Sequence, residues 1–329
     1  MTVSHRRVVL CSIVLAVFMA RPDALQAADP PPYPDHPVRI VVPFAPGGGT
    51  DLIARSIAQR LGERMGQPFV VENKPGAGGT IGTDAVAKAR PDGYTLLMAT
   101  NATLALAPGL YKSLPYDSGA DLVTVALIAS GPSVLVVNPS IPVKDFAEFL
   151  VYARANPGKL NYGSAGNGSM AHVATAILAR DAGLDVVHIP FKGGAAAVSE
   201  LVAGRLSFMV AGPVETLPLV QSGSLRALAI TTAQRVPSIN LSPIAAQGLP
   251  SYEISNWFAI MAPAATPAPI VERLNREINA ILAQPEMRTA LEKQGVEAKA
   301  LDAKAAQAFV VVEVAKWPPL VAASGARAD

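Results

Sequence analysis

Short apolar runs alternate with amphipathic stretches along most of the chain. The first run, residues 38–44, suits a buried strand, and apolar side chains at Leu52, Ile53, Ile57 and Leu61 then recur at helical spacing. The same alternation predicts further strands at 69–71, 94–99, 160–163, 186–191, 206–210, 225–231 and 254–261, with helices at 80–89, 145–155, 170–179, 195–202, 214–221, 267–282, 285–294 and 303–317. Strands and helices in alternation indicate parallel sheets that are covered by helices.

This pattern occurs twice, which predicts an α/β fold of two lobes. Two long apolar segments, 122–137 and 225–231, are placed to pass from one sheet to the other and form a two-strand hinge. We assign residues 28–130 plus 232–329 to lobe 1 and residues 131–231 to lobe 2. Ligands in such folds bind outside the carboxyl ends of strands, so we expect a ligand cleft between the lobes.

Four loops at predicted strand ends are candidates for that cleft: 44–51, 164–169, 192–194, and the pair Thr100 and Asn101. Glycines let the backbone approach a ligand, and the helices that follow present free amides at the positive end of the helix dipole. Such a helix start is an anion site. Two of them facing each other across a cleft would hold a molecule with a carboxylate at each end.

Each loop also has a structural interpretation, because glycine turns and hydroxyl caps are common. Asp51 would repel a bound carboxylate, so we expect it to cap the helix that starts near Thr50. His172 is the one histidine expected near these loops, and a packing or capping role is the more common one for such a residue. Lys192 suits either a contact with a carboxylate or a solvated loop.

Several segments together resemble the Bug-type solute-binding receptors of tripartite tricarboxylate transporters: PFAPGGGTD (43–51), VENKPGAGG (71–79), PDGYTLL (91–97), YGSAG (162–166), HIPFKGG (188–194) and LRALAIT (225–231). The resemblance extends to Trp257, Phe258, Glu313 and Trp317 and covers nearly all of the chain after the first 27 residues. It implies a type II periplasmic binding protein that closes on a small carboxylate and delivers it to the membrane subunits of the transporter. It also implies a monomer with neither enzymatic activity nor a cofactor.

Carried over to this chain, the resemblance places Phe44, Ala45, Gly48, Gly49, Thr50 and Asp51 on one side of the ligand and Ser164, Ala165, Gly168, Ser169 and Lys192 on the other. The strand-end loops add further candidates to this ligand-binding set, namely Thr100, Asn101, His172 and Gly193.

The first 27 residues have the layout of a secretory signal peptide. A basic start at His5, Arg6 and Arg7 precedes an apolar run over 8–20, and small residues follow at Ala27 and Ala28. A membrane anchor is the alternative, but the run is shorter than the ~20 residues of a spanning helix. We therefore predict export to the periplasm with cleavage near Ala27, leaving a soluble protein. That cleavage would remove the only cysteine, three arginines and one aspartate, so the formal net charge of +2 would fall to zero.

Composition excludes several other classes of function. A chain without a basic excess is a poor partner for nucleic acid, which needs clustered lysine and arginine. Four histidines and one cysteine offer no metal-binding cluster. The sequence has neither a G-x-S-x-G nucleophile motif nor a phosphate-binding G-x-x-x-x-G-K-[ST] loop. A receptor that signals to a membrane partner remains an alternative to transport, and a periplasmic α/β enzyme is a weaker one.

Overall fold

Two sheets organise residues 33–327, which are the residues that the computed structural model describes. The predicted signal peptide lies outside them. Strand order is β11-β4-β10-β3-β1-β2 in the first sheet and β7-β6-β8-β5-β9 in the second. The first sheet contains β1 (Val38–Val42), β2 (Phe69–Asn73), β3 (Thr95–Thr100), β4 (Leu122–Pro132), β10 (Ser255–Pro263) and β11 (Glu297–Ala298). The second contains β5 (Val134–Val137), β6 (Leu160–Ser164), β7 (Val186–Pro190), β8 (Phe208–Ala211) and β9 (Arg226–Ile230).

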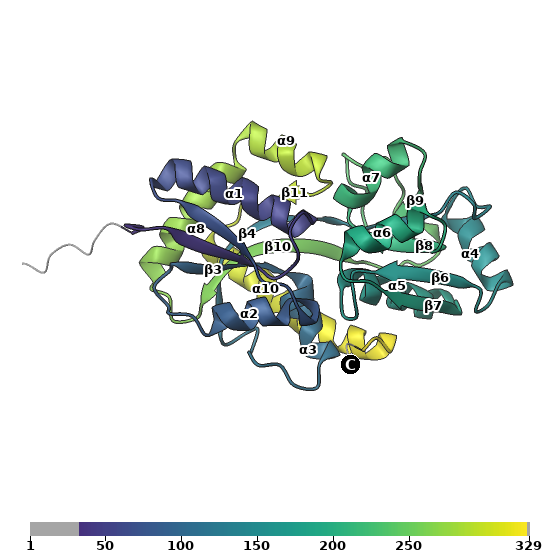
Figure 1. Cartoon of the computed structure of the whole chain (residues 1–329), viewed down its shortest axis with the longest axis horizontal. Coiled ribbons are helices and arrows are strands. Elements are labelled where there is room, and N and C mark those ends of the chain that lie inside the picture. The colour runs from purple at the N-terminus through teal and green to yellow at the C-terminus, as the bar shows by residue number, and fades with distance from the viewer. Residues whose placement is uncertain (1–32, 328–329) are drawn as a thin grey trace, which may run out of the picture. The chain divides into compact units, whose positions relative to one another are not determined.

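Helices connect and cover both sheets, as the α/β pattern predicts (Figure 1). Their bounds are α1 (Gly49–Met65), α2 (Thr80–Ala87), α3 (Ala107–Leu110), α4 (Phe146–Ala155), α5 (Met170–Ala182), α6 (Gly194–Val202), α7 (Pro213–Gln221), α8 (Ala268–Leu282), α9 (Pro285–Lys293) and α10 (Ala303–Ser324). Short helical turns lie at η1 (Ala77–Gly79), η2 (Ala102–Leu106) and η3 (Ile244–Gln247). In the first sheet β1 pairs in parallel with β2 and β3, and in the second β6 pairs in parallel with β7 and β8.

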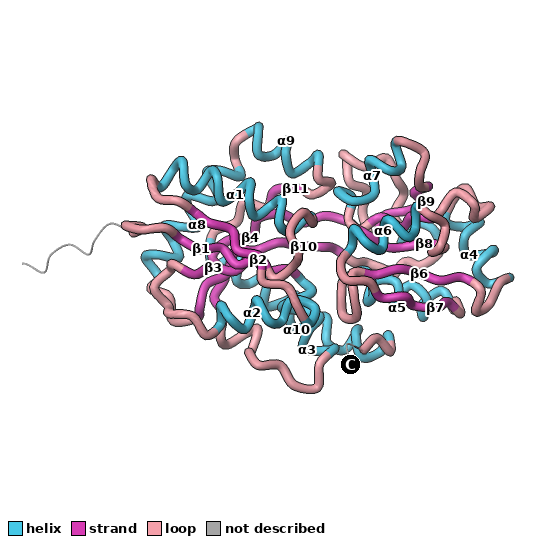
Figure 2. Tube along the Cα trace, in the orientation of Figure 1, coloured by secondary structure: helices cyan, strands magenta, loops and turns pink. Residues whose placement is uncertain are grey.

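The predicted passage of residues 122–137 between the sheets is confirmed. β4 lies beside β10 in the first sheet (Figure 2). After one residue, Ser133, the chain continues as β5 between β8 and β9 of the second sheet. β9 differs from the prediction, because it lies wholly in the second sheet and the chain returns through residues 231–254.

The two connections are hydrogen-bonded to each other where they meet. The Ser133 backbone N–H donates to Oγ1 of Thr231 (2.8 Å), and the Thr231 N–H donates to the Ser133 carbonyl (3.0 Å). The Thr231 hydroxyl in turn donates to the Ile254 carbonyl (2.7 Å), and Nδ2 of Asn256 donates to Oγ of Ser133 (2.7 Å). These side chains tie the crossing segments into one unit, which we call the hinge network.

Apolar residues form three buried clusters. One cluster contains residues of both sheets, such as Leu97 of β3 and Phe208 of β8. A second lies between the first sheet and helices α1 and α8, and a third between the second sheet and α6. The two sheets thus share one apolar core. On the sides covered by α1 and by α6, each sheet has a core of its own.

Residues 102–110 form a helical segment that the sequence pattern does not predict. The π-helical turn η2 follows β3 directly and leads into α3. Thr103 fixes its start, because its Oγ1 donates to the Thr100 carbonyl and accepts from the Thr100 N–H. The Tyr116 hydroxyl also donates to the Thr103 carbonyl (2.6 Å). An apolar run interrupted by Pro108 and Gly109 hides this turn from a periodicity search.

Within residues 33–327, α10 is the one helix long and apolar enough to cross a membrane by length and composition alone. It extends beyond the predicted end at Trp317 through Pro318 and Pro319. Ala306, Val310, Trp317 and Val321 are buried, and the helix packs on β4 and α3. A Cβ atom at Gly109 of α3 would lie 3.0 Å from the Pro318 backbone, so glycine permits this close approach.

Candidate functional site

The loop between β1 and α1 is held by a buried carboxylate. Asp51, which is 2% exposed, accepts hydrogen bonds at Oδ2 from the Gly47 N–H (3.0 Å) and Nε of Arg55 (2.9 Å). Its Oδ1 accepts from Nδ2 of Asn73 (2.9 Å), which also donates to the Phe44 carbonyl. Burial alone would raise the pKa of Asp51, but the hydrogen bonds from Arg55, Gly47 and Asn73 outweigh it, so the pKa is lowered.

Asp51 therefore organises this loop but does not cap the helix in the predicted way. The N-cap of α1 is Gly48, and no side chain caps it. Asp51 instead reaches one residue further back, to Gly47, which lies in the left-handed region at φ +85° where glycine is favoured. The amides of the first turn of α1, which include Gly49 and Thr50, are left without a side-chain cap.

The loop between β6 and α5 is built around two stacked imidazoles. The rings of His172 and His188 lie 4.0 Å apart at an angle of 4°. Nδ1 of His172 accepts from the Gly168 N–H (3.1 Å), and Nε2 of His188 is 2.7 Å from Oγ of Ser164. Burial, and then the neighbouring His172, lowers the pKa of His188 to about 4, and burial lowers that of His172. Two neutral histidines thus support this loop.

Ser169 is the N-cap of α5, because its side chain accepts a hydrogen bond from the His172 N–H (3.3 Å). Ala165 is exposed, whereas Ser164 and Gly168 are buried. His172 has the packing role expected for it, but the expectation that it is the one histidine near these loops is wrong. His188 of β7 contacts both His172 and Ser164, although 16 positions separate the two histidines in the sequence.

The pair Thr100 and Asn101 lies at the end of β3 and is buried. Nδ2 of Asn101 donates to the Ser255 carbonyl of β10 (2.8 Å), and its Oδ1 accepts from the Ala102 N–H (3.1 Å). Within residues 33–327, Oγ1 of Thr100 has no hydrogen-bond partner. Asn101 thus joins β3 to β10, and its side chain is engaged within the protein.

Lys192 and Gly193 lie between β7 and α6. Lys192 is exposed, and Gly193 is the N-cap of α6 at φ +113°. Among the described residues, no side chain caps α6 or the neighbouring α7, whose N-cap is Gly212. α6 and α7 therefore begin, like α1, without side-chain caps.

Loops and helix starts of the two sheets approach each other at several points, two of which involve segments near predicted residues. A Cβ atom at Gly49 of α1 would lie 3.8 Å from Cγ2 of Val214 in α7. One at Gly78 of η1 would lie 3.8 Å from the carbonyl oxygen of Asn167, in the β6–α5 loop. Phe44 lies against η1, where a Cβ atom at Gly79 would be 3.3 Å from its ring. Of the predicted ligand-binding residues, Gly49 thus lies close to α7. Phe44 lies close to η1, which approaches the β6–α5 loop.

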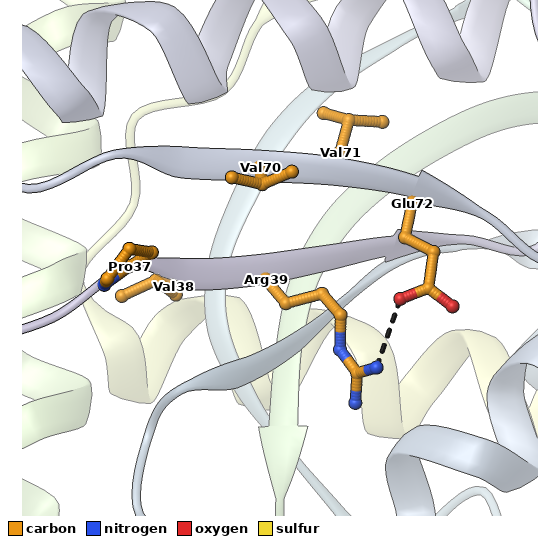
Figure 3. A pocket seen from close by; sticks show the side chains of 6 residues that line it. All are labelled: Pro37, Val38, Arg39, Val70, Val71 and Glu72. Carbon is orange, nitrogen blue, oxygen red and sulfur yellow. Dashed lines mark hydrogen bonds and ion pairs between the residues drawn. The ribbon is translucent and has the colours of Figure 1, made fainter.

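Two surface cavities lie elsewhere. One, of about 300 Å³, is lined by Pro37, Val38, Arg39, Val70, Val71 and Glu72 on β1 and β2 (Figure 3). Nη1 of Arg39 and Oε2 of Glu72 form an ion pair across it at 3.0 Å. The other, of about 600 Å³, lies beside Tyr116 and Pro318. Neither is lined by a predicted ligand-binding residue, so strand-end geometry rather than cavity size indicates the site.

Comparison with known proteins decides the family. The model for the tripartite tricarboxylate transporter family receptor, TctC, matches residues 53–326. The chain belongs to this receptor family. Protein BugT of Bordetella pertussis is 37% identical over 320 residues, which cover 95% of this chain and 97% of BugT.

Two solved structures resemble this receptor over most of its length. R. palustris Rpa4515 with adipate has a TM-score of 0.85 and 36% identity, and the match covers 90% of this chain and 99% of that one. MatC from Rhodopseudomonas palustris with bound malate has a TM-score of 0.82 and 33% identity, covering 88% and 100%. The resemblance to Bug-type receptors is confirmed, as is the assignment to solute-binding proteins and not enzymes. Receptors of this family are periplasmic.

Sequence reasoning missed several residues that shape this receptor. Ser133, Thr231 and Asn256 form the hinge network through side chains far apart in the sequence, and no local pattern marks them. His188 is brought to this loop by the strand register, in which β6 and β7 pair Tyr162 with His188 and Ser164 with Pro190, and the sequence alone does not give that register. Glu215 at the start of α7 gave no signal, since an acid in the first turn of a helix is ordinary.

Proposed function

We propose that this chain captures a small carboxylate between the β1–α1 loop and the loops of the second sheet, and delivers it to a tripartite tricarboxylate transporter. The observation that supports it most directly is the uncapped first turn of α1. Its amides follow the glycine loop that the Asp51 network fixes, and they lie next to a contact with α7. Relatives solved with adipate and with malate favour the same ligand class.

The binding step would use donors that the fold already holds in place. Free amides at Gly49 and Thr50 and the Thr50 hydroxyl suit one carboxylate group, because the helix dipole favours negative charge there. Ser164, Ala165 and Ser169 are the proposed partners on the second sheet. Rotation of the two lobes about the hinge network would then complete the binding site, and ligand binding would shift the population towards the closed form.

The double substitution Thr50→Ala with Ser169→Ala tests this placement. Isothermal titration against a panel of C4–C6 mono- and dicarboxylates would first identify the best ligand of the unaltered protein. We expect the double variant to bind that ligand at least tenfold more weakly, since each lost hydroxyl is worth roughly 1 kcal/mol. Ser222→Ala, an exposed hydroxyl at the end of α7, is the matched control and should leave the affinity unchanged. Unchanged affinity in the double variant would refute the placement, and a panel without any binder would refute the function.

The cellular setting is part of the same proposal. Residues 1–27 would direct export and be removed near Ala27, and the released receptor would act as a monomer on the membrane subunits. Amino-terminal sequencing of protein from the periplasm, gel filtration with light scattering, and copurification of the membrane subunits would test these three statements.

A further inference from the structure

Glu215 lies in the first turn of α7, where several candidate segments meet. The residue before it, Val214, contacts Gly49 at the start of α1. Pro213 packs closely on Gly295, in the turn between α9 and β11. The first turn of α7 therefore lies against the start of α1 and the α9–β11 turn, and Glu215 belongs to that first turn.

The carboxyl group of Glu215 occupies the start of α6. A Cβ atom at Gly194 would lie 2.7 Å from its Oε2 and 2.8 Å from its Oε1. Both oxygens thus lie beside the first residue of α6, which follows Lys192 and Gly193. The sequence pattern assigned this helix start to a carboxylate of the ligand. A second carboxylate at this position would meet the Glu215 carboxyl group already there.

No partner for this carboxyl group is found within residues 33–327. It is partly buried and takes part in no side-chain hydrogen bond or ion pair among them, and Lys192 does not reach it. Burial raises the pKa of the Glu215 carboxyl, because removal from water disfavours its charged form. By comparison, Asp51 is compensated by three donors. A donor supplied by the ligand would satisfy Glu215 as Arg55 and Asn73 satisfy Asp51.

We propose that Glu215 selects the ligand's second functional group and that the preferred solute carries a carboxylate at one end and an ammonium group at the other. The carboxylate would bind at the first turn of α1, and the ammonium group would pair with Glu215. This inference rests on the proposed function, which supplies the carboxylate site. It replaces the expectation of two facing anion sites with one anion site and one cation site.

Length-matched ligands test this directly. Three pairs replace one carboxylate of a dicarboxylate by an ammonium group: succinate and β-alanine, glutarate and 4-aminobutyrate, and adipate and 5-aminopentanoate. Titration of the unaltered chain should give, for the pair of best-fitting length, at least tenfold tighter binding of the amino acid, because opposite charges attract and like charges repel at close range. Glu215→Gln keeps the shape but removes the charge. It should reduce this preference at least tenfold.

Glu272→Gln is the matched control, because Glu272 is exposed on α8 and away from these contacts. It should leave the preference unchanged. Thermal melting of each variant checks folding, and Glu215→Ala serves if Glu215→Gln does not fold. Tighter binding of the dicarboxylate, or a preference that survives in the Glu215 variants, would overturn the role of Glu215 while leaving the carboxylate receptor intact. Failure of all six compounds to bind would overturn both.

Discussion

Substitution of Asp51 by asparagine tests how the β1–α1 loop is held. In the native loop three donors converge on two carboxylate oxygens: the Gly47 N–H, Nε of Arg55 and Nδ2 of Asn73. Asparagine offers a single acceptor oxygen, and its amide group would face at least one of these donors. Because Asp51 is only 2% exposed, water cannot replace the lost acceptor.

The expected loss follows from these contacts. A hydrogen bond to a charged group contributes about 1.5–3 kcal/mol to stability. Arg55 is half exposed, so solvent screens its ion pair and we count no stabilisation from it. Losing the acceptor for either Gly47 or Asn73 should then lower the free energy of unfolding by about 2–3 kcal/mol in total. With an unfolding entropy of about 2 cal/mol/K per residue, a chain of this length should melt at a temperature about 3–5 °C lower.

Urea unfolding and thermal melting, followed by circular dichroism at pH 7, measure this loss. Asp185→Asn, an exposed position before β7, is the matched control and should melt like the unaltered chain. Titration with the best carboxylate ligand should also show weaker binding, because Gly47 would lose its anchor. A free energy of unfolding within about 0.5 kcal/mol of the unaltered value would show that the Asp51 network does not hold the loop.

Two further predictions concern stability. Oε2 of Glu313 accepts hydrogen bonds from Trp257 Nε1 (3.1 Å) and Trp317 Nε1 (2.9 Å), and both indoles are fully buried. Glu313→Ala should therefore lower the free energy of unfolding by about 2–5 kcal/mol, and Glu313→Gln, which keeps an acceptor, by clearly less. Denaturant titration of both variants measures these losses, and equal losses would contradict the prediction. Burial, and then His172, lowers the pKa of His188 from 6.5 to about 4, so between these values the unfolded chain holds a proton that the folded one lacks. The free energy of unfolding should therefore be unaffected above pH 6.5, fall by roughly 1–3 kcal/mol as the pH drops from 6.5 to 4, and level off below. Urea titrations at pH 7, 6, 5 and 4 test this against His188→Gln, and parallel curves for the two proteins would contradict it.

Most of the element order could be predicted from the sequence, because apolar periodicity reflects burial. The segment 122–137 is an example. Its apolar run is too long for one strand, and it forms β4 in the first sheet and β5 in the second. Helix 102–110 could not be predicted in this way, since its start depends on hydrogen bonds of Thr103 and Tyr116 and not on a periodic apolar face.

For the candidate site, the sequence could predict which loops are involved but not what each side chain does. Glycine loops after strands are local features of the sequence, so the loops 44–51 and 164–169 could be predicted as candidates. The pairing of Asp51 with Asn73, of Ser164 with His188, and of Glu215 with Gly194 depends on how separate elements pack. Such contacts join residues 20 or more positions apart, and a single sequence contains no record of them.

The core shared by the two sheets also bears on how the molecule unfolds. Because Leu97 of the first sheet and Phe208 of the second belong to one apolar cluster, loosening either sheet exposes surface of the other. Residues 33–327 should therefore lose structure in a single cooperative transition. The middle segment, 131–231, lacks this shared core when cut from the chain and should not fold alone. A ligand held by one sheet would then protect amides of both sheets from hydrogen exchange with solvent.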